Sequence, residues 1–343
     1  MVALVGTDLI KLTHRQVNLA LELLIVAAIL TGLLSWSLGD RWNGALTFAH
    51  GVGGIAVALL VPAKLRGSVR TGFRRGRTSR WLSAVFGVLV LITLSLGVLH
   101  ATGLWFGVGQ WTALWTHELF GFSLVPFLVW HVASRPVRPS PHDLQRRALL
   151  RLGGLAAIAA ALHVTQRVSA SAVGLAGGDR RSTGSHEVGS FDPARMPTVI
   201  WLNDHTPAVT DAATWQLRVD GERIEIDTLR RRSRPVVASL DCTGGWWSEQ
   251  AWDAVSLSDL ISEPSGRSVR VESVTGYERH FPIGDLADIF LAVGYGGEPL
   301  RRGHGAPVRL VVPGRRGPEW IKWVTEIECS DRPPWLQPPL PLS

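Results

Sequence analysis

Long apolar runs in the first half of the chain constrain its fold most strongly. Four of them are long enough to cross the roughly 30 Å of hydrocarbon in a bilayer. They cover about 17–38, 44–62, 81–104 and 111–133. A fifth run, at about 148–165, is richer in Ala and Gly and less hydrophobic. We therefore expect residues 1–165 to form an all-α transmembrane bundle of five helices in the lipid bilayer.

Basic residues are concentrated in two loops of this half. Residues 64–80 (KLRGSVRTGFRRGRTSR) contain seven Lys or Arg and no acid, and residues 134–147 are also basic. The positive-inside rule then places the N-terminus and both loops in the cytoplasm, and everything after about residue 166 outside. The first run lacks a signal-peptide cleavage pattern, so we expect a retained helix. The localisation predicted is a bacterial cytoplasmic membrane, multi-pass, with the second half on the extracellular or periplasmic side. Since the net charge of +7 lies in these loops, it does not indicate nucleic acid.

Histidines within the apolar runs are the candidates for chemistry in the membrane, because ionisable groups there are costly. His117 and His131 lie 14 residues apart on the fourth helix. That spacing is close to four turns, so both face one side, about 21 Å apart. His50 is level with His117, and His14 is level with His131. Each cross-bundle pair could ligate a haem iron through two imidazoles. The alternative is that each histidine makes a hydrogen bond to a neighbouring helix.

The placement of these four histidines resembles the di-haem cytochrome b subunit, or gamma subunit, of membrane formate dehydrogenases and hydrogenases. The resemblance implies two b haems and electron exchange with the quinone pool. His100 and His163 fit neither pair, and they could be structural or close to a quinone. A second alternative stays open, in which the membrane half is a haem-free anchor.

The junction between the halves begins with Gln145-Arg-Arg-Ala-Leu-Leu-Arg151. It resembles a twin-arginine export signal, which would imply the twin-arginine machinery as a partner. The alternative is two arginines that anchor the helix in the cytoplasm. Residues 166–196 are rich in Ser, Gly and charge, and we expect a flexible linker there.

The stretch Ser239-Leu-Asp-Cys-Thr-Gly-Gly-Trp-Trp247 places a cysteine directly after a β-type run. Two glycines follow, so the backbone can turn tightly and let a large group approach. A thiolate there suits a soft, redox-active metal. Alternatively, Cys242 is a buried structural residue or half of a disulfide with Cys329.

A second stretch, residues 296–323 (GGEPLRRGHGAPVRLVVPGRRGPEWIKW), resembles the molybdopterin domain of the sulfite oxidase family. The resemblance covers about 197–330 and implies an α+β fold, a molybdenum–molybdopterin cofactor and Cys242 as the protein ligand to molybdenum. It assigns cofactor contacts to Asn203, His205, His304, Arg309 and Lys322. It also places Tyr277 at the molybdenum pocket, where the alternative is a core tyrosine. Arg315 and Arg316 share the loop and are further candidates, unless that loop is simply solvated.

Secondary structure in this half is expected to be mixed. Residues 214–221, 269–274 and 308–312 have the pattern of strands, while 256–261 and 284–292 resemble helices. Residues 331–343 form a Pro-rich tail, for which the composition predicts disorder.

Two departures from the family pattern bear on the substrate. Leu202 stands where sulfite oxidases carry the arginine that binds sulfite, and Thr-Gly-Gly-Trp follows the cysteine in place of Ala-Gly-Asn-Arg. Arg279 or His280 could replace the lost charge. The sequence therefore predicts a membrane-anchored molybdoenzyme that transfers an oxygen atom to or from a small substrate, with sulfoxide reduction as one hypothesis. A sulfite oxidase-type dehydrogenase and a non-catalytic cofactor-binding scaffold are the alternatives.

Overall fold

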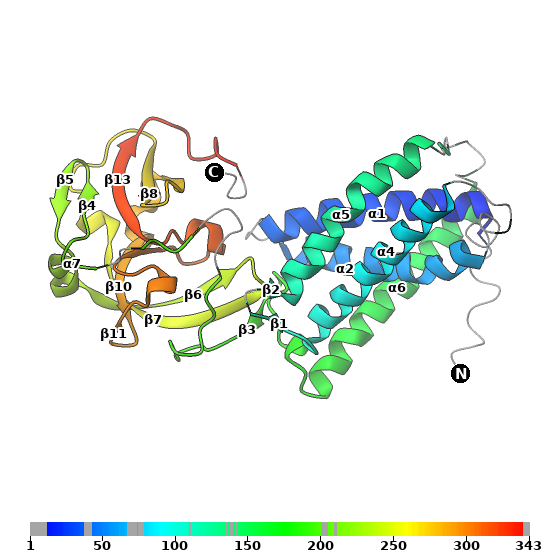
Figure 1. Ribbon diagram of the computed structural model, residues 1–343, viewed down its shortest axis with the longest axis horizontal. Helices are drawn as coiled ribbons and strands as arrows, with labels where there is room; N and C mark the ends of the chain where they lie inside the picture. The colour runs from blue at the N-terminus through cyan, green and yellow to red at the C-terminus, as the bar shows by residue number, and fades with distance from the viewer. Residues whose placement is uncertain are drawn as a thin grey trace. The chain divides into compact units, whose positions relative to one another are not determined.

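The computed structural model describes residues 12–37, 43–66, 74, 79–109, 111–134, 136–137, 140, 143, 145–199, 205–208 and 211–338. The chain divides into two compact units (Figure 1). The helical unit comprises residues 1–36 and 41–184, and the β-rich unit comprises residues 37–40 and 185–343.

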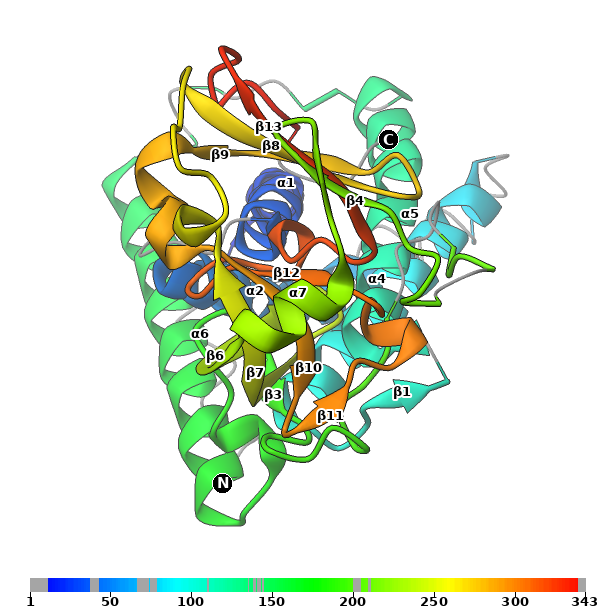
Figure 2. The same ribbon diagram turned by 90° about the vertical axis from the view of Figure 1, so that its left-hand side faces the viewer.

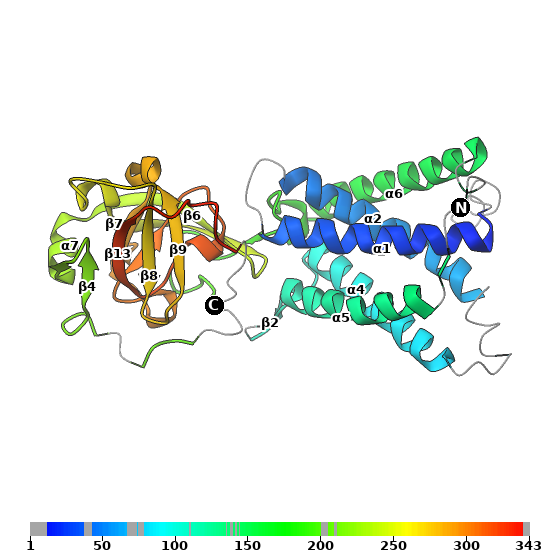
Figure 3. The ribbon, with the colours of Figure 1, turned by 90° about the horizontal axis from the view of Figure 1, so that it is seen from above.

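Five long apolar helices form the helical unit within the described residues (Figure 3). They are α1 (His14–Ser37), α2 (Asn43–Lys64), α4 (Arg80–Thr102), α5 (Ala113–Ser134) and α6 (Arg146–Ala172). All five are long and apolar enough to cross a membrane, which confirms the predicted series of five helices. A short hairpin, β1 (Gly107–Val108) and β2 (Trp111–Thr112), precedes α5.

Apolar side chains cover both the inner and the outer faces of these helices. Leu21, Leu60 and Leu124 are buried between them, whereas Leu23 is 70% exposed and Val129 is 62% exposed. A soluble helix would carry polar residues on that outer face. The pattern is compatible with lipid around the helical unit.

Polar contacts tie the two ends of the helical unit. At one end, Arg15 forms an ion pair of 3.0 Å with Asp143, and Lys64 Nζ donates to Asn18 Oδ1 at 2.6 Å. At the other end, Thr47 Oγ1 donates to the carbonyl of Ser182 at 2.7 Å. These contacts fix the helix ends relative to one another within the unit.

Two sheets form the β-rich unit, and they lie in separate layers (Figure 2). The first has the order β11-β10-β7-β3, with β12 on β10 and β6 on β7. Its strands are β3 (His186–Glu187), β6 (Arg234–Cys242), β7 (Trp246–Ser256), β10 (Phe290–Tyr295), β11 (Glu298–Pro299) and β12 (Arg309–Val311). The second has the order β5-β4-β13-β8-β9. Its strands are β4 (Leu217–Val219), β5 (Glu222–Ile224), β8 (Ser268–Ser273), β9 (Glu278–Pro282) and β13 (Val324–Ser330).

The core of the β-rich unit is dominated by large aromatic side chains. Trp252, fully buried on β7, stacks on Tyr295 with ring centroids 5.6 Å apart. Its indole nitrogen donates to the carbonyl of Ala238 at 3.0 Å, so the ring is both packed and bonded. Strand β7 alternates buried and half-buried residues because one face meets this core. A short helix, α7 (Ile226–Arg232), also buries Leu229 in it.

Strand predictions for this unit are confirmed at β4, β8 and β12, while one helix prediction is partly wrong. Residues 283–288 form the 3-10 helix η5, but Phe290–Ala292 belong to β10, paired with both β7 and β12. Pairing on both sides satisfies the backbone as a strand and overrides the helix-like local pattern. The predicted helix at 256–261 is the shorter 3-10 helix η4 (Leu257–Asp259).

Residues 166–196 carry regular structure where composition predicts a flexible linker. Helix α6 continues to Ala172, and the 3-10 helix η3 (Ala176–Gly178) follows within the helical unit. In the β-rich unit, His186 and Glu187 pair in parallel with Trp246 and Trp247 of β7. Backbone hydrogen bonds, together with the burial of Met196 in the core, hold this largely polar segment in place.

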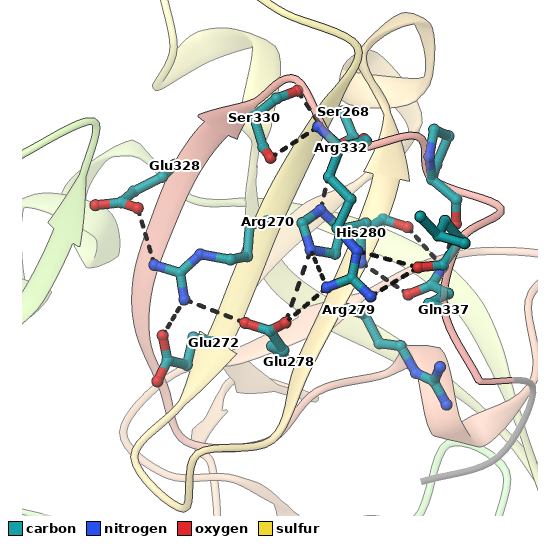
Figure 4. Close-up of polar contacts among 12 residues, drawn as sticks. Ser268, Arg270, Glu272, Glu278, Arg279, His280, Glu328, Ser330, Arg332 and Gln337 are labelled. Atoms are coloured by element: carbon teal, nitrogen blue, oxygen red, sulfur yellow. Dashed lines mark hydrogen bonds and ion pairs between the residues drawn. The ribbon is translucent and has the colours of Figure 1, made fainter. Parts of the chain in front are cut away.

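The tail is ordered through Pro338 where its composition predicts disorder (Figure 4). Gln337 pairs with the backbone of His280, accepting from its N–H at 3.0 Å and donating to its carbonyl at 2.9 Å. Arg332 donates to the carbonyl of Leu336 and to Glu278 on β9. Beside it, Arg270 forms ion pairs with four glutamates on the same face of the sheet, Glu272, Glu278, Glu326 and Glu328. These contacts hold the tail against the second sheet.

Candidate active site

Cys242 ends strand β6 and opens the turn that leads into β7. Its thiol is half-buried and reduced, and Gly244 N–H donates to its sulfur at 3.4 Å. Cys329 is also reduced, so the disulfide alternative does not apply. Burial raises the pKa of the Cys242 thiol, while Gly244 N–H, Lys322 and Arg316 act in the opposite direction. In the metal-free protein the net effect favours the neutral thiol, and the nearby donor and cations offset it only in part. A bound metal would take the thiolate form.

Asp241 and Arg316 form a buried ion pair directly beside the cysteine. Arg316 Nη1 lies 2.8 Å from Asp241 Oδ1, and the side chains are 3% and 10% exposed. Ser185 Oγ donates to the same carboxylate oxygen at 2.7 Å. Arg316 and Asp241 also pair through their backbones in a parallel bridge. The loop that carries Arg316 is therefore attached to the end of β6 at the predicted metal ligand.

The next residues of that loop connect Cys242 with Tyr277. A Cβ at Gly317 would lie 3.2 Å from Cys242 Cα, tighter than most such contacts, so glycine lets the loop lie against the cysteine. The loop then forms the 3-10 helix η7 (Gly317–Glu319), where the carbonyl of Pro318 accepts a hydrogen bond of 2.7 Å from Tyr277 Oη. Tyr277 in turn accepts from Arg279 Nε at 2.6 Å. The structure thus brings Cys242 and Tyr277 to the same short loop.

His304 lies in a second buried cluster. Its Nδ1 is 2.7 Å from Tyr295 Oη, and its Nε2 is 3.0 Å from Thr198 Oγ1. Burial lowers the pKa of His304 to about 4, and the charges of Arg309 and Lys322 act in the same direction. The imidazole is therefore neutral at pH 7. Through these contacts His304, in the loop after β11, is joined to Thr198 and to Tyr295 at the end of β10.

Lys322 and Arg309 place two cations between these clusters. Lys322 Nζ donates to the carbonyls of Gly303 at 2.7 Å and Val199 at 2.9 Å. Arg309 is 1% exposed and donates to the carbonyls of His304 and Trp320 at 3.0 and 3.1 Å. Burial lowers the pKa of Arg309 to about 10, so it stays charged at pH 7. Both cations lie within electrostatic range of Cys242.

The other predicted contacts occupy different surroundings. Arg315 is 44% exposed and pairs with Asp285 at 3.1 Å and Glu319 at 3.5 Å. His205 is exposed in a segment where the carbonyl of Pro207 accepts from Arg302 Nε at 2.9 Å. Asn203 lies outside the described residues. Their roles stay predictions, and Arg316 is the loop arginine placed next to Cys242.

Two of the four histidines predicted to bind haem lie close together in the helical unit, with their ring planes nearly perpendicular. The ring centroids of His50 and His117, here called the histidine pair, are 5.8 Å apart with planes at 88°. His50 Nδ1 bonds the carbonyl of Ala28 at 2.8 Å, and His117 Nδ1 bonds the carbonyl of Thr93 at 2.9 Å. These bonds assign the proton to Nδ1 and leave Nε2 as a lone-pair donor.

Glycines on neighbouring helices make room for both rings. A Cβ at Gly32 would lie 2.9 Å from His50 Cε1, and a Cβ at Gly97 would lie 3.1 Å from His117 Cε1. The other predicted pair is less defined. His131 is buried against Phe86, with ring centroids 5.7 Å apart, while His14 is exposed at the first residue of α1. That pair stays a prediction.

Sequence reasoning missed two residues of the site, Asp241 and Tyr295. Asp241 precedes the cysteine, but its partner Arg316 is 75 positions away in sequence. Tyr295 precedes two glycines and bonds His304 nine positions later. A charged residue next to the predicted ligand and a tyrosine ending an apolar strand were the available signals.

Comparison with known proteins shows what the β-rich half of the chain is similar to. Residues 203–336 match the family model described as the oxidoreductase molybdopterin binding domain. The mitochondrial sulfite oxidase of Drosophila melanogaster is 44% identical over 74 residues, which are 22% of this chain and 12% of that protein. The sulfite oxidase of Gallus gallus is 27% identical over 176 residues, which are 38% of each chain.

Among solved structures, the sulfane dehydrogenase SoxCD from Paracoccus pantotrophus is similar to part of the chain. It has 26% sequence identity and a TM-score of 0.34, and the match covers 36% of this chain and 39% of that one. The chain thus spans well under half the length of the relatives named here.

Proposed function

We propose that the chain is a membrane-anchored molybdoenzyme, because residues 203–336 match the oxidoreductase molybdopterin binding domain and are similar to sulfite oxidases. It transfers an oxygen atom to or from a small substrate outside the cytoplasmic membrane and exchanges electrons through b haems with quinone. The observation that carries the enzymatic part is Cys242, held at the end of β6 by the loop that contains Arg316 and Gly317.

The residues around Cys242 fit a molybdenum–molybdopterin group. Trp246 is 1% exposed, and its indole N–H has no hydrogen-bond partner among the residues that the structure describes. That nitrogen would lie 3.2 Å from a Cβ at Gly244, so it borders the turn after the cysteine. A buried donor without an acceptor is costly unless a bound group supplies one.

When bound, the molybdenum centre supplies two-electron oxygen-atom transfer. In our proposal Cys242 is its protein ligand, and Lys322 with Arg309 offsets the negative charge of the thiolate and of the pterin phosphate. Asn203, His205, His304 and Arg316 are the further cofactor contacts we propose, and Arg315 is the weakest of them because it is exposed. Tyr277 is proposed at the substrate side.

The histidine pair fits a haem iron. Metal–imidazole bonds of about 2 Å on both sides of an iron place two ring centroids roughly 6 Å apart, close to the 5.8 Å observed. The carbonyl bonds to each Nδ1 are the usual support for a ligating imidazole. We propose a second haem at His14 and His131, and quinone as the electron partner, which gives single-electron steps between the two cofactors.

Membrane topology in the proposal follows the charge distribution. Lys64, Arg146 and Arg147 lie at the end of the helical unit that holds the basic loops, which we assign to the cytoplasm. Because α6 ends at the opposite side, the β-rich unit would lie outside. Export by the twin-arginine machinery, with Arg146 and Arg147 as the signal, belongs to the same proposal.

For the substrate, the structure offers Arg279 as a source of positive charge. Arg279 is 4% exposed, and its Nη2 has no hydrogen-bond partner within the described part of the chain. It reaches Tyr277, whereas His280 turns to the opposite face of β9 and bonds Ser268 at 3.1 Å (Figure 4). We propose that Arg279 replaces the arginine lost at Leu202 and binds a substrate oxygen, such as that of a sulfoxide.

The test is metal analysis of the detergent-purified protein together with a dithionite-reduced spectrum. We expect about one molybdenum and two haem irons per chain. Cys242→Ser abolishes molybdenum-dependent turnover, and the matched control Cys329→Ser retains it. Full turnover in Cys242→Ser would refute the assigned ligand.

Other outcomes separate the alternative functions. Molybdenum without iron would indicate that the helical unit binds no haem and serves only as an anchor. Reduction of the haem by sulfite would favour a sulfite oxidase-type dehydrogenase. Bound molybdenum without turnover on any oxo substrate would favour a non-catalytic scaffold.

A further inference from the structure

A buried arginine lies at the end of the helical unit that holds the histidine pair. Arg180 follows η3 and is 8% exposed. Its one hydrogen bond to the described residues runs from Nη1 to the carbonyl of Ala101, at 2.6 Å. Burial lowers the pKa of Arg180 to about 10, so the guanidinium remains charged at pH 7. No Asp or Glu in the described ranges forms an ion pair with it.

The chain around η3 is built to bring this arginine close to α4. A Cβ at Gly177 would lie 2.2 Å from the carbonyl oxygen of Ala101, and one at Gly178 would lie 2.4 Å from Ser171 Cα. Only glycine fits at such distances. The segment therefore packs against the ends of α4 and α6, and Arg180, which follows it, reaches the carbonyl of Ala101 on α4.

A second buried titratable residue lies within electrostatic range of Arg180. His163 on α6 is 5% exposed and lies against Gly51, the residue after His50, where a Cβ would be 2.4 Å from its ring. The cations Arg180 and Arg167 both lie within electrostatic range of it. His163 makes no hydrogen bond to the described residues, so its ring nitrogens are available to a ligand.

Arg180 lies close enough to the histidine pair for one bound molecule to contact both. The ring of His117 packs on Gly97, and Ala101, which bonds Arg180, lies four residues further along α4. Four residues of helix rise by about 6 Å. A molecule ligated by the histidine pair would therefore have its edge one helical turn from the buried guanidinium.

We propose that Arg180 and His163 bind the propionate carboxylates of the haem assigned to the histidine pair. The inference rests on the haem part of the proposed function. A buried cation needs an opposite charge, and a planar guanidinium with four unused N–H donors matches a carboxylate. The carboxylates supply both charge and acceptors, and His163 adds a ring N–H.

The experiment titrates full-length protein in detergent, purified from a haem-deficient host, with haem and with haem dimethyl ester. The ester lacks the two negative charges but keeps the iron and the ring. We expect Arg180→Gln to raise the dissociation constant for haem at least tenfold and to leave the constant for the ester unchanged. Arg66→Gln, an exposed arginine just after the end of α2, is the matched control and leaves both constants unchanged.

A second readout is the midpoint potential of the bound haem. Loss of a neighbouring positive charge makes reduction of the haem less favourable. We expect the equilibrium constant for haem reduction to be about tenfold lower in Arg180→Gln, which corresponds to a midpoint potential lower by roughly 59 mV for one electron. His163→Gln gives a smaller shift in the same direction. It serves as the test if Arg180→Gln does not fold.

Three results would overturn the inference. Equal dissociation constants and potentials in wild type and Arg180→Gln exclude the contact. Equal weakening for haem and its ester assigns Arg180 a purely structural role. Wild type that binds no haem removes the inference together with the haem part of the proposed function, whereas the first two results leave that function intact.

Discussion

Arg315 and Arg316 are neighbours in sequence that should differ sharply when replaced. Arg316 is 3% exposed against Asp241, while Arg315 is 44% exposed against Asp285 and Glu319. Replacing Arg316 with Met takes away the buried positive charge opposite Asp241, although Ser185 still donates to that carboxylate. Replacing Arg315 with Met removes only solvated ion pairs.

The expected magnitudes follow from this burial. Breaking a buried ion pair by removing one partner costs about 3–5 kcal/mol, because the remaining charge stays desolvated. An exposed pair contributes about 1 kcal/mol or less. For a unit of this size, each kcal/mol lowers the melting temperature by roughly 2–4 °C. We therefore expect Arg316→Met to lower the melting temperature of the β-rich unit by roughly 6–20 °C and Arg315→Met by about 4 °C at most.

The assay is thermal unfolding of the purified chain followed by tryptophan fluorescence, with molybdenum content measured in parallel. The double variant Arg316→Met with Asp241→Leu removes both charges and should recover most of the loss. If Arg316→Met melts within about 2 °C of Arg315→Met, the pair does not hold the loop and the reasoning fails.

Three further expectations concern single residues. The folded state favours neutral His304, whose pKa of about 4 lies below the ordinary 6.5. Its stabilisation is complete above pH 6.5 and is lost toward pH 4, by up to about 3 kcal/mol, so urea unfolding of His304→Gln should show a flatter pH dependence. Gly97→Val should displace His117 and lower the haem absorbance, whereas Gly87→Val, with nothing within 4 Å, should not. Because burial raises the pKa of Cys242, metal-free protein should react slowly with iodoacetamide at pH 7, and rapid labelling by mass spectrometry would contradict this.

Apolar length was enough to predict the five helices, because a run that spans a bilayer has few other structures available. It did not predict where α6 ends. The last turns, Gln166–Ala172, are mostly polar or small, yet their backbone continues the helical hydrogen bonds. Residues 290–292 were predicted to be helical and instead form part of β10. Their helix-like sequence pattern is overridden by pairing with two strands that are distant in sequence.

For the site, the resemblance to the sulfite oxidase family predicted roles for Cys242 and His304, and those roles stay predictions. It could not separate Arg315 from Arg316, because burial depends on the strand that the loop meets. Likewise, the histidine pair was predicted from helix register, while Arg180 was not singled out. Its burial depends on two glycines and on a helix end far away in sequence.

The attachment of Gln337 to β9 also bears on how copies of the chain meet. β9 is the last strand of its sheet, and the backbone N–H and carbonyl of an edge strand can template the addition of a strand from another molecule. At His280 both groups are already bonded to the amide of one side chain. The tail therefore protects this edge against intermolecular sheet growth, so its removal should promote aggregation even if catalysis is unimpaired.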